Sequence, residues 1–279
     1  MRSTLALSAL LLAAAATLAA CEDNTTPQPD VPPTLPTCVP NRDGQITAAE
    51  LPIALGATVA YYASPTGTTR TVDLAGTGSG DAHRWDLSAE RADDVVVGLG
   101  PVELRDQWYA PDFPASEFSV PAGGGLDGIY HQTDEALFLD GTASQDERPA
   151  AGKTLIVYAQ PVAVLRFPIV DGDAYSTVAQ ILGATIDGLP FIGTDEIAVD
   201  ISGRGRLDVP YVEFSPVLRA RTLVTRKPST GTPVITKRST DFMFECFGQI
   251  AHAESQTNEA NADFTTAAFL RRFALGETP

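Results

Sequence analysis

Short apolar segments separated by turn residues recur along most of this chain, and they constrain its fold more than any other feature. The segments are rich in Val, Ile, Tyr, Phe and Thr, and clusters of Gly, Pro and Asp lie between them. They fall at 58–62, 70–74, 95–99, 155–159, 162–167, 197–201, 206–211, 217–225 and 234–246. Within 197–201, apolar residues alternate with small or polar ones, so one face is apolar. The pattern predicts a mainly β domain, either an antiparallel β-sandwich or a partly open β-barrel.

Helices are expected to be few and short. Residues 173–183 fit a helix capped by Asp173, but β-branched residues at 177 and 178 favour a strand, which is our prediction. Residues 264–275 fit a helix and a strand about equally, and the pattern leaves them undecided. Thr47 and Glu50 have the spacing of a capping box at the start of a short helix. We therefore expect one or two short helices beside the strands.

The first residues of the chain have the form of an export signal. Arg2 precedes an uncharged Leu- and Ala-rich run over 5–20, which is too short to cross a bilayer as a stable helix. The run ends in Leu18-Ala19-Ala20-Cys21, which resembles the lipobox of bacterial lipoproteins. The resemblance implies that the signal peptide 1–20 is removed and that Cys21 is lipidated. The alternative is an ordinary signal peptide with an incidental cysteine.

Residues 21–37 are expected to be a lipid-anchored tether in front of a single β domain, 38–279. The segment is rich in Pro and Thr, cannot bury apolar surface and favours extended polyproline geometry. The anchor implies an exported protein held to a membrane of the bacterial envelope, most simply the outer membrane, facing the periplasm or the cell surface. The net charge of −16 disfavours nucleic acid as a partner. Once Cys21 is lipidated, Cys38 and Cys246 are the only other cysteines, and outside the cytoplasm this pair predicts a disulfide.

Residues 39–50 resemble the calcium loop of an EF-hand from its third position onward. The ligands that the resemblance implies for a weak Ca²⁺ ion are Asn41, Asp43, the Gln45 carbonyl, Thr47 and Glu50. However, Val39 stands where the motif has its first carboxylate, and proline-rich residues replace the entering helix. The alternative is a turn followed by a capped helix, with no metal.

Six basic residues and no acidic ones lie between 219 and 238, in a predicted hairpin that turns at 228–233. The basic residues are Arg219, Arg221, Arg226, Lys227, Lys237 and Arg238. A basic patch on an acidic protein would attract an anionic lipid headgroup, a polysaccharide or an acidic partner. Alternatively, acidic residues on neighbouring strands neutralise the patch, because opposite charges across strands stabilise a sheet.

No complete catalytic or cofactor motif is present in the sequence. His252-Ala253-Glu254 matches part of a zinc deaminase signature but lacks the later pair of cysteines. His131, with Asp127, Asp134 and Glu135, is the densest group of histidine and carboxylates, and a solvated loop and strand edge explain it without chemistry. We therefore predict that the chain is not an enzyme and that it has no certain cofactor.

A second, weaker resemblance concerns the domain itself. Four short motifs are similar to landmarks of uncharacterised secreted β-rich proteins of bacterial surfaces. They are Trp85-Asp86-Leu87-Ser88, Phe113-Pro114, 166–172 and 203–207. The resemblance implies a β fold and export, and no activity.

The predicted function is that of a non-catalytic cell-envelope lipoprotein whose β domain binds or scaffolds an envelope protein, a polysaccharide or a lipid. One alternative is a carrier that holds a lipid or other hydrophobic ligand in a β-barrel cavity. Another is a hydrolase with an unrecognised site.

Overall fold

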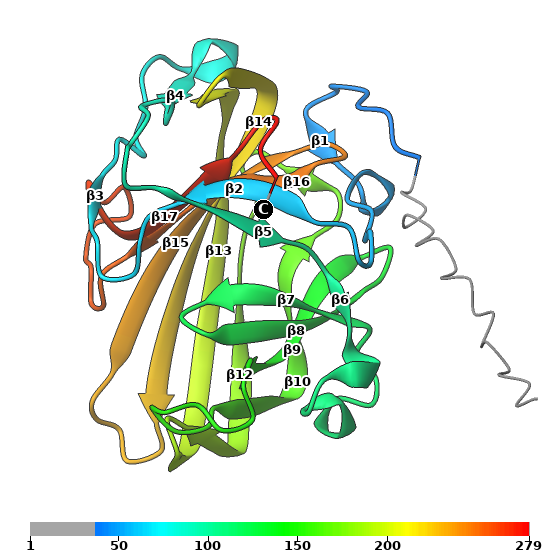
Figure 1. Ribbon diagram of the computed structural model, residues 1–279, viewed down its shortest axis with the longest axis vertical. Coiled ribbons are helices and arrows are strands. Elements are labelled where there is room, and N and C mark those ends of the chain that lie inside the picture. The colour runs from blue at the N-terminus through cyan, green and yellow to red at the C-terminus, as the bar shows by residue number, and fades with distance from the viewer. Residues whose placement is uncertain (1–36, 279) are drawn as a thin grey trace, which may run out of the picture. The chain divides into compact units, whose positions relative to one another are not determined.

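Strands make up nearly all of the regular structure in the computed structural model, which describes residues 37–278 (Figure 1). In chain order the strands are β1 (Gln45–Ile46), β2 (Val59–Ala63), β3 (Arg70–Thr71), β4 (Arg84–Asp86), β5 (Val95–Leu99), β6 (Val102–Glu103), β7 (Phe118–Gly123), β8 (Leu126–Gln132), β9 (Ala136–Ser144), β10 (Leu155–Arg166), β11 (Ile169–Val170), β12 (Ala174–Ile186), β13 (Leu189–Val209), β14 (Val212–Pro228), β15 (Ile235–Phe244), β16 (Gly248–Ser255) and β17 (Thr266–Phe273). The helical turns are η1 (Ala48–Glu50), η2 (Gly80–Ala82), η3 (Leu104–Asp106) and η4 (Ala110–Asp112). The mainly β prediction is confirmed.

The expected short helices are 3-10 turns of three residues each, and there are four of them within 37–278. One is η1, which begins directly after Thr47 as the capping box predicts. The segment 173–183 lies in β12, so the prediction of a strand there is confirmed. The undecided segment 264–275 contains β17.

One sheet of 15 strands holds almost the whole domain, in the order β5-β2-β17-β16-β15-β14-β13-β12-β10-β9-β8-β7-β6 with β3 and β4 at its side. All pairs are antiparallel except that of β4 with β13. β1 and β11 form a separate two-stranded sheet. The strand β13 has 21 residues and contains the predicted segment 197–201 and most of 206–211. The glycines at 203 and 205, which separate these segments in the sequence, lie where the pairing register with β14 shifts. Gly203 has φ +115°, a conformation that favours glycine.

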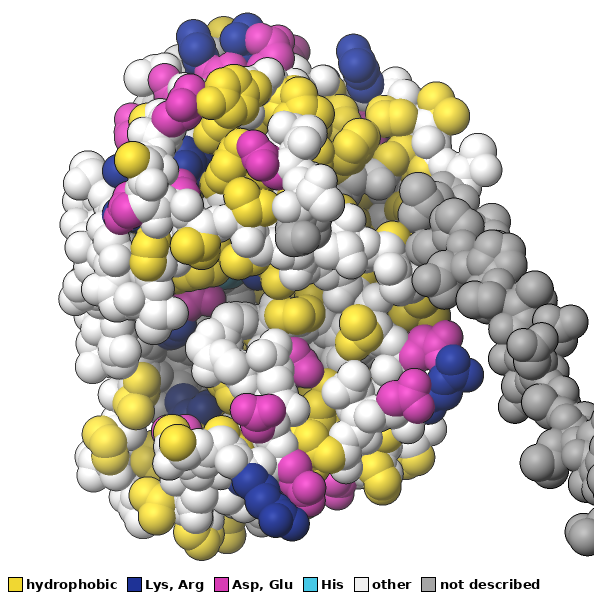
Figure 2. All heavy atoms as spheres, viewed as in Figure 1, with side chains coloured by type: hydrophobic (Ala, Val, Ile, Leu, Met, Phe, Trp, Pro, Cys, Tyr) yellow, Lys and Arg dark blue, Asp and Glu magenta, His cyan; other side chains and the backbone are white. Residues whose placement is uncertain are grey.

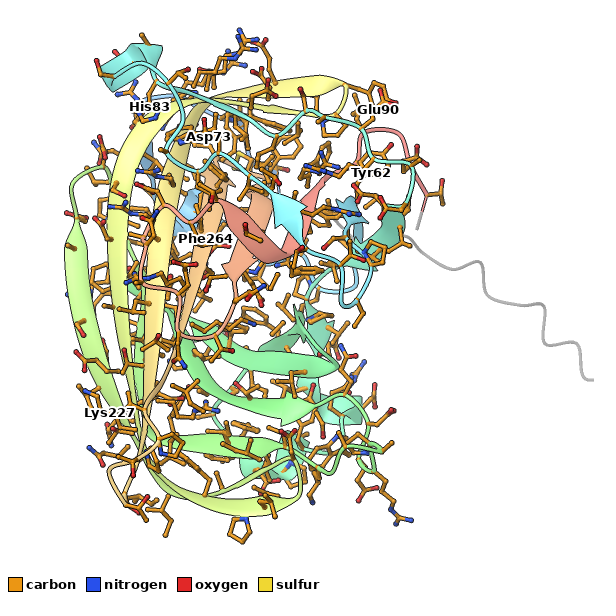
Figure 3. The ribbon with its side chains drawn as sticks, turned by 90° about the vertical axis from the view of Figure 1, so that its left-hand side faces the viewer. Tyr62, Asp73, His83, Glu90, Lys227 and Phe264 are labelled. Atoms are coloured by element: carbon orange, nitrogen blue, oxygen red, sulfur yellow. A yellow bond between two sulfur atoms is a disulfide. The ribbon has the colours of Figure 1, made fainter. Side chains whose placement is uncertain are left out.

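The sheet curls so that its two ends come close together without closing. β5 and β6 are the end strands of the sheet, yet only Gly100 and Pro101 separate them in the chain. No strand pairing joins β5 to β6 among the residues that the structure describes, so the sheet is not closed into a barrel. β10 and β12 share one registered pair, Leu155 with Thr185, and the sheet opens there. Figures 1 and 3 both show β7 and β8 facing the long strands β13–β15 across the curl.

Three apolar cores hold these layers together. The first surrounds the fully buried Trp85, whose indole Nε1 donates to the Leu74 carbonyl at 3.1 Å and whose ring packs edge-on against Phe242. The second fills the interior between the long strands and β10, with Ile181 and Val199 among its buried residues. The third lies beneath β7–β9, on the side covered by η3 and η4. Alternate side chains of 197–201 and 155–159 point into the second core, which is why these two segments have the apolar pattern of strands.

The disulfide predicted between Cys38 and Cys246 is present, with 5.5 Å between the two Cα atoms. It fixes the start of the described chain beside the turn that joins β15 to β16. The expected signal peptide 1–20, the lipidated Cys21 and the tether residues 21–36 lie outside the described residues. No helix within 37–278 is long and apolar enough to cross a membrane.

Candidate functional site

Strands β15, β16 and β17 place a row of charged side chains on the concave face of the curled sheet. The register pairs Asp241 with His252 and His252 with Arg271, and side chains paired across strands share a face. The alternation along each strand brings further polar residues to the same face. We refer to this group as the charged wall: Lys237, Asp241, Gln249, His252, Glu254 and Arg271.

His252 lies at the centre of the charged wall, between two carboxylates. Its Nδ1 is 2.6 Å from Oδ1 of Asp241, and its Nε2 is 3.1 Å from Oε1 of Glu254. Both contacts are satisfied only when both ring nitrogens carry hydrogen, which is the imidazolium form. Burial alone would lower the pKa of His252, but Asp241 and Glu254 outweigh it and raise that pKa above its ordinary value. The ring is therefore held as a cation that cross-links β15 and β16.

The remaining members of the charged wall extend this network in two directions. Arg271 donates from Nε to Oε1 of Gln249 at 2.9 Å, and Gln249 donates in turn to Asp241. On the other side, Glu254 forms an ion pair with Lys237. Burial would raise the pKa of Glu254, but His252 and Lys237 lower it to about 2. Each carboxylate of the wall thus has at least one donor partner.

Exposure increases along the charged wall from His252 to Lys237. The side chain of His252 is 12% exposed and that of Lys237 is 52% exposed. Lys237 thus lies at the mouth of the site, with ammonium hydrogens left over after its pair with Glu254. The recessed members remain in contact with solvent.

Strands β7 and β8 cover the charged wall from the opposite side of the curl. Burial raises the pKa of Tyr130 on β8 to about 12, and the charges of Arg271 and Asp241 both act on its hydroxyl. A Cβ built on Gly123, at the end of β7, would lie 3.9 Å from Oε1 of Glu254. Figure 2 shows this face hollowed between its upper and lower parts, with Lys or Arg and Asp or Glu side chains visible inside. The site is a recess between two parts of one sheet.

The arrangement favours binding over catalysis. Both nitrogens of His252 are engaged by carboxylates, so the ring has no free lone pair with which to accept a proton. Among residues 37–278, no group of three or more His, Cys, Asp or Glu side chains has the geometry to hold a metal ion. The aromatic rings of Tyr61 and Phe269 lie beside the network, the first near Arg271 and the second near His252. Paired charges with adjacent rings are suited to a polar ligand.

The six basic residues of 219–238 do not form a free basic patch. β14 and β15 form the predicted hairpin, and five of the six residues pair with a carboxylate. The pairs are Arg219 with Asp263, Arg221 with Asp200 and Asp263, Arg226 with Asp195, Lys227 with Glu196, and Lys237 with Glu254. Arg238 donates to the carbonyl oxygens of Glu259 and Ala260. The structure therefore agrees with the alternative in which neighbouring carboxylates neutralise the basic residues. These carboxylates come from β13, from β16 and from the loop before β17.

The loop that resembles an EF-hand has the geometry of a turn followed by a cap. The carboxylate of Glu50 accepts from the Asn41 amide at 2.7 Å and from the Thr47 backbone N–H and hydroxyl. The carboxylate of Asp43 accepts from the backbone N–H of Gln45 at 2.8 Å. The oxygens proposed as calcium ligands are thus occupied by hydrogen bonds within the loop, and calcium binding stays a prediction.

His131 has a different carboxylate partner from those that the sequence suggests. Its Nδ1 is 2.9 Å from Asp140, which also accepts from the Ser116 hydroxyl at 2.7 Å. Asp127 instead accepts from the hydroxyl of Tyr109 at 2.7 Å. Asp140 lies between Ser116 and His131, whereas in a hydrolytic triad the histidine lies between the serine and the carboxylate. The group is therefore a structural hydrogen-bond network.

Sequence reasoning missed the charged wall because its members come from three strands whose order and register are not visible in the chain. The available hint was His252-Ala253-Glu254, in which two polar residues on one face of a strand flank a small one. Neither the curl of the sheet nor the pairing of Asp241 with His252 follows from that fragment. Comparison of the chain with protein-family models, with curated proteins and with solved structures finds no significant match.

Proposed function

We propose that this chain is a non-catalytic binding protein of the bacterial cell envelope, held to a membrane by a lipid on Cys21 and binding an envelope polysaccharide at the charged wall. The observation that carries the binding function is the recessed network around His252, in which Lys237, His252 and Arg271 face two carboxylates. The sequence at 18–21 and the disulfide next to the tether support export.

A polysaccharide suits the charged wall better than a lipid does. Sugar hydroxyls both donate and accept hydrogen bonds, and the wall presents ammonium, guanidinium, amide and carboxylate groups side by side. The ring of Phe269, near His252, offers apolar surface to the C–H face of a sugar, whereas the Tyr61 ring is buried with the Arg271 guanidinium over it. The interior next to the wall is filled by the second apolar core, which leaves the carrier alternative without support.

The chain offers a matched pair of lysines to test the polysaccharide site. Lys237 pairs with Glu254 inside the curl, and Lys227 pairs with Glu196 on the outer face, with similar exposed fractions of 52% and 47%. Lys237→Gln should weaken binding of soluble envelope polysaccharide fragments by about tenfold, the effect of losing a charged hydrogen bond. Isothermal titration calorimetry measures the change. Lys227→Gln should leave the affinity within about twofold; equal losses, or no binding by the unsubstituted protein, would contradict the proposal.

The lipid anchor is tested separately. Cys21→Ser should abolish acylation and lower the fraction of the protein retained on membranes, because the acyl chains on Cys21 supply the main membrane attachment in this proposal. Fractionation of cells followed by intact mass measurement checks this result. An unsubstituted protein whose mass includes no acyl chain, or equal membrane retention of Cys21→Ser and the unsubstituted protein, would refute the anchor and leave the polysaccharide test unaffected.

A further inference from the structure

Large apolar side chains are exposed together at one end of the domain, where the hairpins β12–β13 and β14–β15 end. We call this group the apolar tip: Leu182, Leu189, Ile192, Val234 and Ile235. Leu182 and Leu189 are the most exposed, at 71% and 70%. A hydrogen bond of 2.9 Å from the Ser229 N–H to the Ile192 carbonyl ties the two hairpins together. Figure 2 shows hydrophobic side chains gathered at the lower end, where the long strands of Figure 1 terminate.

The backbone directs these side chains outward. The register between β12 and β13 shifts between Ile181 and Ala184, so an extra residue is accommodated next to Leu182. Such bulges are a common way to redirect a side chain. Asp187 has φ +50° in the tight turn before Leu189, which pairs with Ile186 at the very end of the hairpin. Isolated apolar residues on a surface are ordinary, whereas several on adjacent hairpin ends indicate a contact surface.

We propose that the apolar tip docks into the interfacial region of a lipid bilayer, the one to which the lipid on Cys21 attaches the chain. The inference rests on the lipid anchor of the proposed function. The residues between Cys21 and the described domain could span about 50 Å at ~3.1 Å per residue. The chain enters the domain at Cys38, next to Cys246 and at the opposite end of β15 from the tip, and the ten residues of β15 span about 33 Å at ~3.3 Å per residue. An extended tether is therefore long enough for the tip to reach the bilayer. Acylated proteins commonly combine a lipid chain with a second membrane contact.

Two features favour a bilayer over a protein partner. The tip consists of projecting hairpin ends and five side chains, whereas a standard protein interface uses about 20–30 residues from each partner. Pro190, Pro228 and Pro233 lie among its residues, and proline brings no N–H that would need a partner in an apolar environment. Lys227, labelled near this end in Figure 3, is neutralised by Glu196 at 2.9 Å.

The test uses the chain from residue 22, which carries no acyl group. Residues 37–278 belong to one compact unit with its own cores and disulfide, so this chain is expected to fold. Sedimentation with vesicles of phosphatidylethanolamine and phosphatidylglycerol should show binding by the unsubstituted chain. The double variant Leu182→Ser, Leu189→Ser should lower the partition coefficient by about tenfold or more.

The matched control is Leu55→Ser, Leu275→Ser, which makes the same change at two exposed leucines outside the apolar tip. This control should bind vesicles as the unsubstituted chain does, and both double variants should unfold at an unchanged urea midpoint. Absence of vesicle binding by the unsubstituted chain would overturn the proposal, as would equal losses in both double variants. A dimer of the unsubstituted chain that the tip variant converts to a monomer would also overturn it and assign the tip to a second copy. Because no acyl group is present, a failed anchor at Cys21 does not affect the result.

Discussion

Replacing Asp195 by leucine is expected to lower the free energy of unfolding by about 3 kcal/mol. Asp195 is fully buried and accepts from Nε and Nη2 of Arg226 at 2.8 and 2.7 Å and from the hydroxyl of Tyr158 at 2.7 Å. Without the carboxylate, the guanidinium is left without a counter-ion next to the apolar interior. The expected loss is at the lower end of the range for a broken buried pair, because the Arg226 side chain is 27% exposed and keeps some hydration.

The neighbouring residue supplies the control for this experiment. Glu196 pairs with Lys227 on the outer face, and both side chains are well exposed, so Glu196→Gln should cost less than about 1 kcal/mol. Removing both charges together, in Asp195→Leu with Arg226→Met, should restore part of the loss. Urea denaturation of the four proteins gives the comparison. Equal effects of Asp195→Leu and Glu196→Gln would show that the buried pair is not a major source of stability.

Loss of the disulfide is expected to have an effect of similar size, about 2–5 kcal/mol. The two cysteines are 208 residues apart, so the cross-link restricts the unfolded chain over most of its length. The ends of the loop retain other contacts, since the Cys246 N–H donates to the Glu50 carbonyl at 2.8 Å and the Arg42 N–H donates to Glu245 at 2.7 Å. We therefore expect Cys38→Ser, Cys246→Ser to fold and to be less stable. Urea midpoints with and without reductant measure the effect on the unsubstituted protein, and the double serine variant should be insensitive to reductant. A midpoint that reductant leaves unchanged would contradict the expectation.

The sequence predicts the class of fold well and individual strands unevenly. The segment 95–99 coincides with β5, because its valines are β-branched, and 197–201 falls within β13, where Ile197, Val199 and Ile201 meet the second apolar core. Strands such as β7 and β8 are missed because they contain several glycines and polar residues. Those residues are tolerated there because pairing with adjacent strands supplies the backbone hydrogen bonds. Local composition therefore identifies the strands with an apolar face and overlooks those that are held mainly by their neighbours.

The charged wall could not be derived from the chain, whereas the disulfide could. Pairing of Cys38 with Cys246 needs only a count of cysteines and an oxidising location. Predicting the charged wall would require the register of three strands and the curl of the sheet that brings Tyr130 opposite Arg271. The basic hairpin illustrates the same limit, since the sequence shows its cations and not the carboxylates of β13 that lie beside them.

The pairing of β2 with β17 has a consequence for how the chain matures. β2 comprises residues Val59–Ala63 and its partner β17 comprises Thr266–Phe273. A strand near the start of the chain therefore pairs with the last strand, and this pairing cannot form before the end of the chain is present. While the chain is incomplete, β2 and β5 can pair with each other, but they have no neighbour that joins them to the rest of the sheet until β17 is present. Contacts between such distant segments form slowly, because a long loop must close before they gain free energy. The topology thereby delays completion of the sheet until almost the whole chain is present.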